Sequence, residues 1–367
     1  MRYLISLLLL ISSTCFGTTY YISTTGNDNN TGTISSPFRN WSKINSIGLH
    51  PGDTVFIRGG TYRTTGNAST SNHLTWSNIN GNANSRIVII NYPGEVPIFN
   101  LDNITPTYSD PTILQVQNCS YLTIKGLTWK GLVQIPSGSG VSRGVNIYQS
   151  TFCRFENCTL TDIGGYGFIL DNGANDNMFY NCDAARMGDP YSTDGGAWGN
   201  ANGFQCTGNS TATRDSFMFN RAWLISDDGF DFYHVSGVFY LYGNWAFNNG
   251  YEPNNPTTPA GDGDGFKLGG DDGGIPTQNL RTVVNCFSAN NKQHGFNRNT
   301  GQMIYTLYNN TAAYNGQKGF MWDYSPQITC NSKNNLAYGN AVAYAGTGIT
   351  GSFNSWNFGG TVNNSDF

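Results

Sequence analysis

The chain repeats a short pattern of polar and apolar residues at a nearly constant interval. The dipeptide Asn-Cys begins at Asn118, Asn157, Asn181 and Asn285, and 24 residues separate Asn157 from Asn181, as they separate Asn285 from Asn309. Self-similarity with a period of roughly 20 to 50 residues is the signature of stacked structural repeats. The pattern therefore predicts a fold built from stacked structural repeats.

The repeated segments have the composition of β-strands. They are short, rich in Val, Ile, Phe, Tyr and Thr, and separated by Gly and Asn, while helical periodicity is almost absent. Such strands suit a right-handed parallel β-helix, in which each coil gives one strand to each of three sheets and equivalent side chains stack about 4.8 Å apart. We therefore predict an all-β fold with one elongated solenoid and ladders of stacked Asn and aromatic side chains.

Two other architectures are considered. A leucine-rich horseshoe is the competing solenoid, but its Leu spacing is missing from the sequence. An antiparallel sandwich or propeller is the remaining all-β alternative.

The first residues indicate export. Residues 1–17 combine Arg2 with an apolar run too short to span a bilayer and end at Gly17, as in a secretory signal peptide. A lipoprotein anchored at Cys15 is the alternative, although the preceding Ser-Ser-Thr fits such a site poorly. No later apolar run is long enough for a membrane span. We expect a secreted monomer, extracellular or periplasmic.

The next segment is predicted to close the end of the solenoid. A solenoid needs a polar-faced cap over its first coil. Residues 18–65 are assigned to this N-terminal cap and first coil, with a short helix at about residues 40–47, and residues 66–367 to the β-helix itself. The opening of the chain resembles the cap of many secreted bacterial β-helix proteins.

Charge and cysteine content exclude several classes of protein. The net charge is -4 and no block of Lys or Arg occurs, so nucleic acid is not an expected partner. Seven cysteines follow Cys15, an odd number without Cys-x-x-Cys spacing, which argues against a zinc site and against a complete disulfide framework. Cysteine is therefore predicted to be a small core residue.

An acidic cluster stands out in a chain of which only 11% is charged. Asp227, Asp228 and Asp231 fall within five residues, and like charges this close repel one another unless something neutralises them. Oxygen-only ligands without nearby His or Cys suit a hard cation, most simply Ca²⁺. We predict that these carboxylates hold calcium in a solvent-facing groove of a sheet. The alternative is that they are solvated turn residues.

A lysine occupies the equivalent place in a later repeat. The string Gly265-Phe266-Lys267 aligns with Gly229-Phe230-Asp231, so Lys267 is expected on the same face one or two coils beyond Asp231. Together they form a metal site beside a potential base. Further acidic residues flank the lysine and form either a second cation site or solvated turns: Asp262, Asp264, Asp271 and Asp272.

The strings around these residues resemble a known enzyme family. The segments SDDGFDFYHVSGVFYLYGNWAFNNGY and GDGDGFKLGG are similar to the core of polysaccharide lyase family 9, the calcium-dependent pectate lyases built on a right-handed β-helix. The resemblance implies that Asp227, Asp228 and Asp231 are calcium ligands and that Lys267 is the catalytic base. It also implies an acidic, uronic-acid-containing polysaccharide as substrate.

The sequence departs from this family at one position. The family's remaining acidic ligand, one coil earlier, falls at Asn202 in the string NANGFQ. An amide oxygen coordinates calcium but brings no charge. We therefore expect Asn202 as a fourth ligand, with weaker calcium binding or a different substrate.

The implied reaction is β-elimination, in which the proton on C5 of a uronate is removed and the oxygen on C4 is expelled. Calcium on the substrate carboxylate would stabilise the developing negative charge. Lys267 must be neutral to accept the proton, and because an ordinary Lys has a pKa of about 10.4, we expect an alkaline optimum. The sequence does not distinguish homogalacturonan, a rhamnogalacturonan and another acidic glycan as the substrate.

Hydrolysis and glycan binding without catalysis are the two alternative functions. A polygalacturonase-type hydrolase would need another Asp one coil before Asp227 and Asp228, and a Gly-His-Gly string after them. This chain has Asn202 at the first place and Gln-His-Gly at His294. A non-catalytic glycan-binding β-helix would use Trp198, Trp245 and Trp322 as platforms. It does not explain Lys267 beside an acidic cluster.

Overall fold

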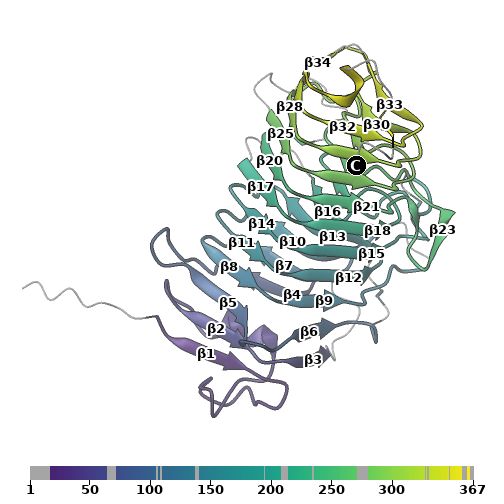
Figure 1. The fold of residues 1–367 in the computed structure, drawn as a ribbon. Helices are drawn as coiled ribbons and strands as arrows, with labels where there is room; N and C mark the ends of the chain where they lie inside the picture. The colour runs from purple at the N-terminus through teal and green to yellow at the C-terminus, as the bar shows by residue number, and fades with distance from the viewer. Residues whose placement is uncertain are drawn as a thin grey trace, which may run out of the picture.

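The chain winds into a stack of coils whose strands form three long parallel sheets (Figure 1). The computed structural model describes residues 17–363 except 64–71, 105, 108–109, 137–139, 194, 208–213, 234, 271–279, 327, 329, 347 and 358–361. The predicted signal peptide with Cys15, and the acidic residues Asp271 and Asp272, lie outside this part. Within it, no helix is long and apolar enough to cross a membrane.

Each coil passes through the three sheets in the order sheet 1, sheet 2, sheet 3. Sheet 1 contains β1 (Thr19–Ile22), β2 (Thr54–Ile57), β5 (Ile87–Asn91), β8 (Leu122–Lys125), β11 (Arg154–Glu156), β14 (Met178–Tyr180), β17 (Arg214–Met218), β20 (Val238–Tyr242), β25 (Leu280–Val284), β28 (Ile304–Tyr308), β31 (Cys330–Lys333) and β34 (Ile349–Ser352). Sheet 2 contains β3 (Gly60–Arg63), β6 (Pro97–Asn100), β9 (Thr128–Lys130), β12 (Thr159–Ile163), β15 (Asp183–Met187), β18 (Arg221–Ile225), β21 (Trp245–Phe247), β26 (Phe287–Ala289), β29 (Thr311–Ala313) and β32 (Leu336–Tyr338). Sheet 3 contains β4 (Asn72–Ser77), β7 (Thr112–Gln117), β10 (Ser142–Tyr148), β13 (Gly165–Asp171), β16 (Phe204–Cys206), β19 (Phe230–Asp231), β24 (Phe266–Lys267), β27 (Phe296–Asn297), β30 (Lys318–Met321) and β33 (Val342–Ala345).

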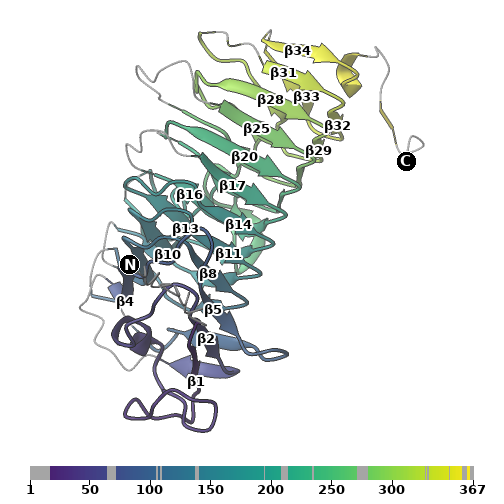
Figure 2. The same cartoon turned by 90° about the vertical axis from the view of Figure 1, so that its left-hand side faces the viewer.

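The remaining elements lie outside the three sheets. A hairpin of β22 (Tyr251–Glu252) and β23 (Asn255–Pro259) is inserted between β21 and β24, and it stands out at the side of the stack where β18 and β21 lie (Figure 1). Two short 3₁₀ helices are η1 (Trp41–Ser46) and η2 (Ser355–Asn357). Seen from the side, the coils rise in one direction from β1 to β34 (Figure 2). The predicted three-sheet parallel β-helix is confirmed.

The repeated Asn residues turn the corners of the coils. Asn157, Asn181, Asn285 and Asn309 all have a positive φ, between 52° and 56°. Asn tolerates this left-handed conformation better than most residues because its short side chain can form local hydrogen bonds. The 24-residue interval in the sequence is therefore the length of one coil, and Asn181 Nδ2 donates to Asn157 Oδ1 at 2.7 Å across that interval.

Buried Asn side chains satisfy the backbone between coils. Asn220 N donates to Asn244 Oδ1 at 2.9 Å, and Asn220 Nδ2 donates to the carbonyl of Phe179 in an earlier coil at 3.1 Å. A second ladder of the same kind runs through Asn249, Asn291, Asn315 and Asn340. Buried backbone groups need such partners, so the predicted Asn ladders explain how the corners can be packed without water.

Stacked aromatic rings fill the core behind sheet 3. Neighbouring rings of this ladder have centroids 4.8 to 5.2 Å apart, which is close to the strand spacing. The ladder consists of Phe168, Phe204, Phe230, Phe266, Phe296 and Phe320. The seven described cysteines are buried and free, as predicted for core residues.

The first coil is covered by the helix that the sequence predicted. In η1, Trp41 stacks on Phe99 with ring centroids 4.3 Å apart and meets Trp76 edge-on at 6.5 Å. The strands β1, β2 and β3 within residues 18–65 already belong to sheets 1 and 2. The boundary between cap and β-helix at residue 65 stays a prediction.

One buried carboxyl group makes stability depend on pH. Asp215 in β17 has no exposed surface, its Oδ1 accepts a hydrogen bond from Asn177 N at 2.8 Å, and its Oδ2 has no hydrogen-bond partner. Burial raises the pKa of Asp215 to about 7. Because an unfolded Asp has a pKa of about 3.9, the folded chain binds the extra proton, and stability falls as the pH rises from about 4 through 7.

Replacing this carboxyl group should stabilise the fold at alkaline pH. Asp215→Asn keeps the acceptor for Asn177 N and removes the ionisable oxygen, so the free energy of unfolding at pH 8 should rise by about 1–3 kcal/mol. At pH 4 the variant should differ little from the wild type. Urea unfolding at the two pH values measures this, and an equal loss of stability at both would contradict it.

Candidate active site

Neighbouring strands of sheet 3 bring the predicted residues together. In the register of the sheet, Gln205 pairs with Asp231, and Asp231 pairs with Lys267 one coil further on. Asp231 and Lys267 therefore occupy equivalent positions in successive coils, as predicted. With Gln205 they form a first column of side chains, and each directly follows a Phe of the stacked ladder. A second column contains Asn202, Asp228 and Asp264, which lie two residues before Phe204, Phe230 and Phe266.

The second column is held by its own hydrogen bonds. The backbone N of Asp228 donates to Asn202 Oδ1 at 3.0 Å, Asp264 N donates to Asp228 Oδ1 at 2.7 Å, and His294 N donates to Asp264 Oδ1 at 3.0 Å. Each side chain therefore accepts a hydrogen bond from the next coil. This arrangement fixes the position of one oxygen on every residue of the column.

A glycine must follow each residue of this column. A Cβ on Gly203 would lie 2.6 Å from the carbonyl oxygen of Gly229, and a Cβ on Gly229 would lie 2.8 Å from that of Gly265. Contacts this short with backbone atoms cannot be relieved by a rotamer change. The repeated strings Asn-Gly-Phe, Asp-Gly-Phe and Asp-Gly-Phe-Lys are thus a packing requirement of the site.

Lys267 lies among the carboxylates. Its Nζ is 3.1 Å from Asp228 Oδ2 and 5.5 Å from the ring centroid of Tyr233. Asp231 Oδ2 accepts from Asn202 Nδ2 at 3.0 Å, and Asp231 Oδ1 accepts from Tyr233 N at 2.8 Å. Because the amide of Asn202 donates to Asp231 and accepts from Asp228 N, the orientation of that amide is defined.

The cluster is buried, which corrects the predicted open groove. The exposed fractions of Asp227, Asp228 and Asp231 are 3%, 0% and 5%, and that of the Lys267 side chain is 14%. The reason is that two insertions between sheets 2 and 3, residues 188–203 and 248–264, fold over the turn that follows β18. Their irregular sequences have no periodicity that would have revealed this cover.

The second insertion also supplies hydrogen-bond donors. Asp262 N donates to Asp227 Oδ1 at 2.6 Å, so the carboxylate of Asp227 is oriented by the same segment that covers it. Asp264, at the end of this insertion, is 2% exposed and its Oδ2 accepts from Asn297 Nδ2 at 2.5 Å. From the sequence Asp264 was predicted only as one of the flanking acids, although its Asp-Gly-Phe string matches that of Asp228.

Burial and like charges dominate the electrostatics. Burial, together with the neighbouring carboxylates, raises the pKa of Asp227 and of Asp264 well above the usual range and that of Asp228 to about 6. Burial alone lowers the pKa of Lys267, but the carboxylates of Asp228 and Asp231 outweigh it, and the pKa of Lys267 is raised above its ordinary value. Lys267 is therefore protonated in this arrangement and is the counter-charge of the cluster.

The donor chemistry of the cluster suits a hard cation. Asp228 Oδ2 is buried and has no hydrogen bond of good geometry, although Lys267 Nζ is near. The predicted ligands Asp227, Asp228, Asp231 and Asn202 offer only oxygen atoms, which Ca²⁺ prefers. In the part of the chain that the structure describes, no group of three or more His, Cys, Asp or Glu side chains is arranged so that it could hold a metal ion. The four ligands stay a prediction.

Other cations near the site have structural partners. Lys292 Nζ donates to the carbonyl oxygens of Ala260, at 2.9 Å, and Gly261, and so holds the second insertion. Arg186 pairs with Asp162 at 2.7 Å and bonds to the hairpin at Pro253 and Asn254. Arg298 has no exposed surface and donates to Pro326 O at 2.9 Å.

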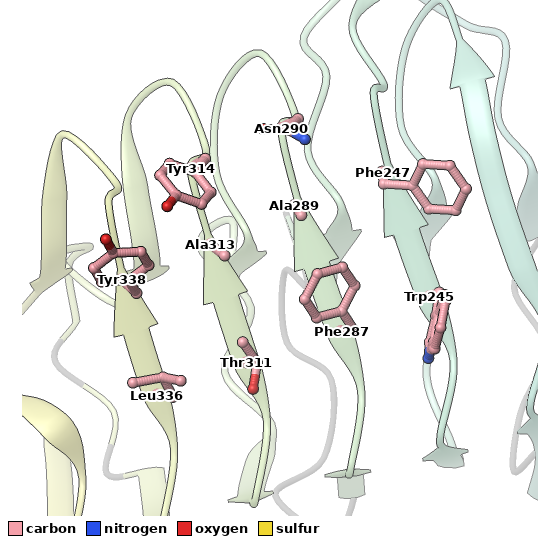
Figure 3. A pocket seen from close by; sticks show the side chains of 10 residues that line it. All are labelled: Trp245, Phe247, Phe287, Ala289, Asn290, Thr311, Ala313, Tyr314, Leu336 and Tyr338. Atoms are coloured by element: carbon pink, nitrogen blue, oxygen red, sulfur yellow. The ribbon is translucent and has the colours of Figure 1, made fainter. Parts of the chain in front are cut away.

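The three tryptophans considered as platforms lie in different places. Trp322 is in the core with no exposed surface, and Trp198 lines a pocket beside the acidic cluster. Trp245 is 51% exposed and lies in a groove of about 670 Å³ on the outer face of sheet 2 (Figure 3). Its aromatic walls include Phe287 and Tyr314, and none of the residues that line this groove is charged.

The role of Lys292 can be tested by loosening the insertion. Lys292→Met should remove its hydrogen bonds to the two carbonyls and about 1–2 kcal/mol of local stability, so the backbone amides of Asp262 and Asp264 should exchange hydrogen about 5 to 30 times faster. Hydrogen exchange read by mass spectrometry measures this. Lys125→Met, which breaks a surface ion pair with Glu156, is the matched control. Unchanged exchange at Asp262 and Asp264 would contradict the assigned role.

Comparison with known proteins identifies the family. A model described as "Pel9A-like, right handed beta helix region" matches residues 20–346. "Pectate lyase L" of Dickeya dadantii is 26% identical over 353 residues, covering 95% of this chain and 77% of the relative. "Pectate lyase PEL9" of Emericella nidulans is 27% identical over 330 residues, covering 82% of this chain and 74% of the relative.

Solved structures agree with this assignment. A "Rhamnogalacturonan lyase" superposes with a TM-score of 0.77 at 29% identity, covering 96% of this chain and 90% of the other. "Pectate lyase Pel9A" superposes with a TM-score of 0.79 at 24% identity, covering 96% of this chain and 83% of the other, which shows the shared fold. The matched region contains both insertions and all of the residues in the two columns. The chain therefore belongs to the Pel9A-like family of right-handed parallel β-helix proteins, polysaccharide lyase family 9, as its acidic and Gly-Phe-Lys strings predicted.

Proposed function

We propose that this protein is a polysaccharide lyase that cleaves an acidic, pectin-type glycan by β-elimination, with Lys267 as the base. The observation that carries the proposal is a partly buried lysine, Lys267, whose side chain is 14% exposed and which lies one coil from Asp231 and 3.1 Å from Asp228. Relatives named as pectate lyases and a rhamnogalacturonan lyase support this class of reaction.

We further propose that Asp227, Asp228, Asp231 and Asn202 hold calcium. The support is the all-oxygen donor set and the buried Oδ2 of Asp228, which is 3.1 Å from Lys267 Nζ but has no hydrogen bond of good geometry. Bound calcium would offset the charge of these carboxylates and of the substrate uronate, and so stabilise the negative charge that develops during elimination. Asn202 Oδ1 already accepts from Asp228 N, so it would use its second lone pair.

Lys267 changes its role when the carboxylates are neutralised. In the cluster by itself, Asp228 and Asp231 hold the proton on the ammonium group. Once their charge is offset, the influence that remains is burial, which disfavours the charged form and lowers the pKa of Lys267. The neutral amine is then available as a base, and the insertions keep bulk water away from it.

The elimination transfers one proton and breaks one C–O bond. The lone pair on Lys267 Nζ takes the proton from C5 of the uronate. The electrons of the C5–H bond form the C4=C5 double bond, and the C4–O bond breaks. The leaving oxygen takes a proton from solvent, and the ammonium group returns its proton to solvent. No oxidant or reductant is needed.

Export through the predicted signal peptide at residues 1–17 and a monomeric state are parts of this proposal that rest on the sequence. Gel filtration and N-terminal sequencing of the expressed protein would test both.

The reaction class can be tested with a panel of acidic polysaccharides. We expect new product with the ultraviolet absorbance of an unsaturated uronate, lost with a calcium chelator and restored by added calcium. New reducing ends without that absorbance would show hydrolysis instead. Binding without either product would show a glycan-binding protein.

The base can be tested by two substitutions. Lys267→Ala should lower kcat by about 10²–10⁴-fold, and Lys267→Arg should also be severely impaired because a guanidinium stays protonated. Wild-type activity should rise with pH as Lys267 loses its proton. Calorimetry should show that both variants still bind calcium. Near-normal turnover by Lys267→Ala on a substrate that the wild type cleaves by elimination would refute this assignment.

A further inference from the structure

The first column of the site contains a residue that has no part in the proposed reaction. The strings Asn-Gly-Phe-Gln, Asp-Gly-Phe-Asp and Asp-Gly-Phe-Lys end at Gln205, Asp231 and Lys267. Strand pairing places Gln205 beside Asp231 on the side opposite to Lys267. Because neighbouring strands lie about 4.8 Å apart, the backbone of Gln205 is as close to Asp231 as that of Lys267. Gln205 is neither the base nor one of the four predicted calcium ligands.

The amide oxygen of Gln205 has no partner. Although the residue is partly exposed, its Oε1 is shielded from solvent and accepts no hydrogen bond from any residue that the structure describes. A buried acceptor without a partner is unfavourable, and in a native structure it requires an explanation such as a bound ion or water. Asp228 Oδ2 is the other buried oxygen of this kind in the two columns between Asn202 and Lys267, all of which are described. The two oxygens belong to the coil of Asp231 and to the coil before it.

The neighbouring oxygens already accept hydrogen bonds. Asn202 Oδ1 accepts from Asp228 N at 3.0 Å. Asp231 accepts on both carboxylate oxygens, from Asn202 Nδ2 at 3.0 Å and from Tyr233 N at 2.8 Å. Each of these oxygens has a lone pair committed within the protein, whereas Gln205 Oε1 has both of its lone pairs free. Gln205 therefore offers the less committed amide oxygen of the two next to Asp231.

A calcium ion at this place needs more oxygen ligands than the carboxylates supply. Ca²⁺ takes roughly six to eight oxygens, and amide oxygens are among its ordinary ligands. In the described part of the chain, acidic, His and Cys side chains alone do not form a group that could hold a metal ion. An amide oxygen adds to the coordination without adding negative charge beside Asp228 and Asp231. The free Oε1 of Gln205 meets this requirement.

We infer that Gln205 is a further calcium ligand, which binds the ion through Oε1. The inference rests on the proposed function and adds to its four ligands a residue that the resemblance to the family does not imply. The two amides then differ in their main roles. Asn202 is held by hydrogen bonds at both ends of its amide and orients Asp228 and Asp231, while Gln205 gives an otherwise unpaired oxygen to the ion.

Calcium binding to the whole chain tests this ligand without any glycan. Gln205→Met keeps an unbranched side chain but removes the oxygen, and calorimetry should show a calcium Kd about tenfold higher than that of the wild type, which corresponds to roughly 1.4 kcal/mol. Gln205→Glu keeps an oxygen at the same place in the side chain and adds a charge, so it should bind calcium at least as tightly as the wild type. Weaker binding by both variants would show damage to the site rather than loss of a ligand, and would overturn the inference.

A glutamine three coils away in the same column is the matched control. Gln115 pairs with Asn146, Asn146 with Ile169, and Ile169 with Gln205. The Oε1 of Gln115 already accepts from Asn146 Nδ2 at 3.0 Å. Gln115→Met should therefore leave the calcium Kd unchanged, and a rise equal to that of Gln205→Met would contradict the inference.

Thermal unfolding separates a metal ligand from a structural amide. With a chelator present, Gln205→Met should unfold at the temperature of the wild type or above it, because the oxygen that it lacks had no partner. With excess calcium, the variant should gain less stability than the wild type, since it binds the ion more weakly. An equal loss of stability in both conditions would show a structural role and would overturn the inference.

The remaining outcomes distinguish this inference from the proposed function. An unchanged calcium Kd for Gln205→Met would overturn the inference, and a raised KM on a polymer that the wild type cleaves would then place Gln205 against the glycan instead. A wild-type protein that binds no calcium would overturn the proposed metal site and this ligand with it. A wild-type protein that binds calcium through Gln205 but forms no unsaturated product from any polymer would contradict the proposed reaction alone.

Discussion

Register between successive coils decides where every side chain of this molecule lies. Parallel pairing places equivalent residues directly above one another at about 4.8 Å. For Phe204, Phe230 and Phe266 this produces stacked rings with centroids 4.8 Å apart, a favourable arrangement. The same register forces Asp228 and Asp264 into one column and Asp231 and Lys267 into the next. The fold thus creates the acidic cluster by the rule that also builds its core.

Burial strengthens the electrostatic interactions within that cluster. In water, a surface pair such as Lys267 and Asp228 would be worth little. Under the two insertions the carboxylates lose hydration, so burial raises the pKa of Asp228 to about 6 and Lys267 holds its proton firmly. Backbone N–H groups of Asp262 and Asp264 orient two of the carboxylates. In this arrangement Lys267 is the counter-charge of the cluster. Under the proposed function, a bound cation would take over that role and leave Lys267 free to act as a base.

The sequence predicted those parts of the structure that repeat. The 24-residue interval between Asn157 and Asn181 predicted the coil, and the Gly-Phe strings predicted that Lys267 pairs with Asp231. The burial of the site was not predicted, because it depends on residues 188–203 and 248–264, whose sequences do not follow the repeat of the coils. Asp264 was predicted only as a flanking acid, because the alignment of Lys267 with Asp231 does not include the residues three positions earlier, Asp228 and Asp264.

The amide at Asn202 follows from the same constraint. Four buried carboxylates already surround one lysine: Asp227, Asp228, Asp231 and Asp264. A carboxylate at Asn202 would add another negative charge beside Asp231 and would lose the hydrogen bond from Nδ2 to Asp231 Oδ2 at 3.0 Å. An amide in this place donates to one carboxylate and accepts from the backbone of the next coil. The amide at Asn202, where the resemblance to the family implies an acidic ligand, therefore avoids further repulsion in the cluster. Under the proposed function, calcium affinity would then depend on Asp227, Asp228 and Asp231.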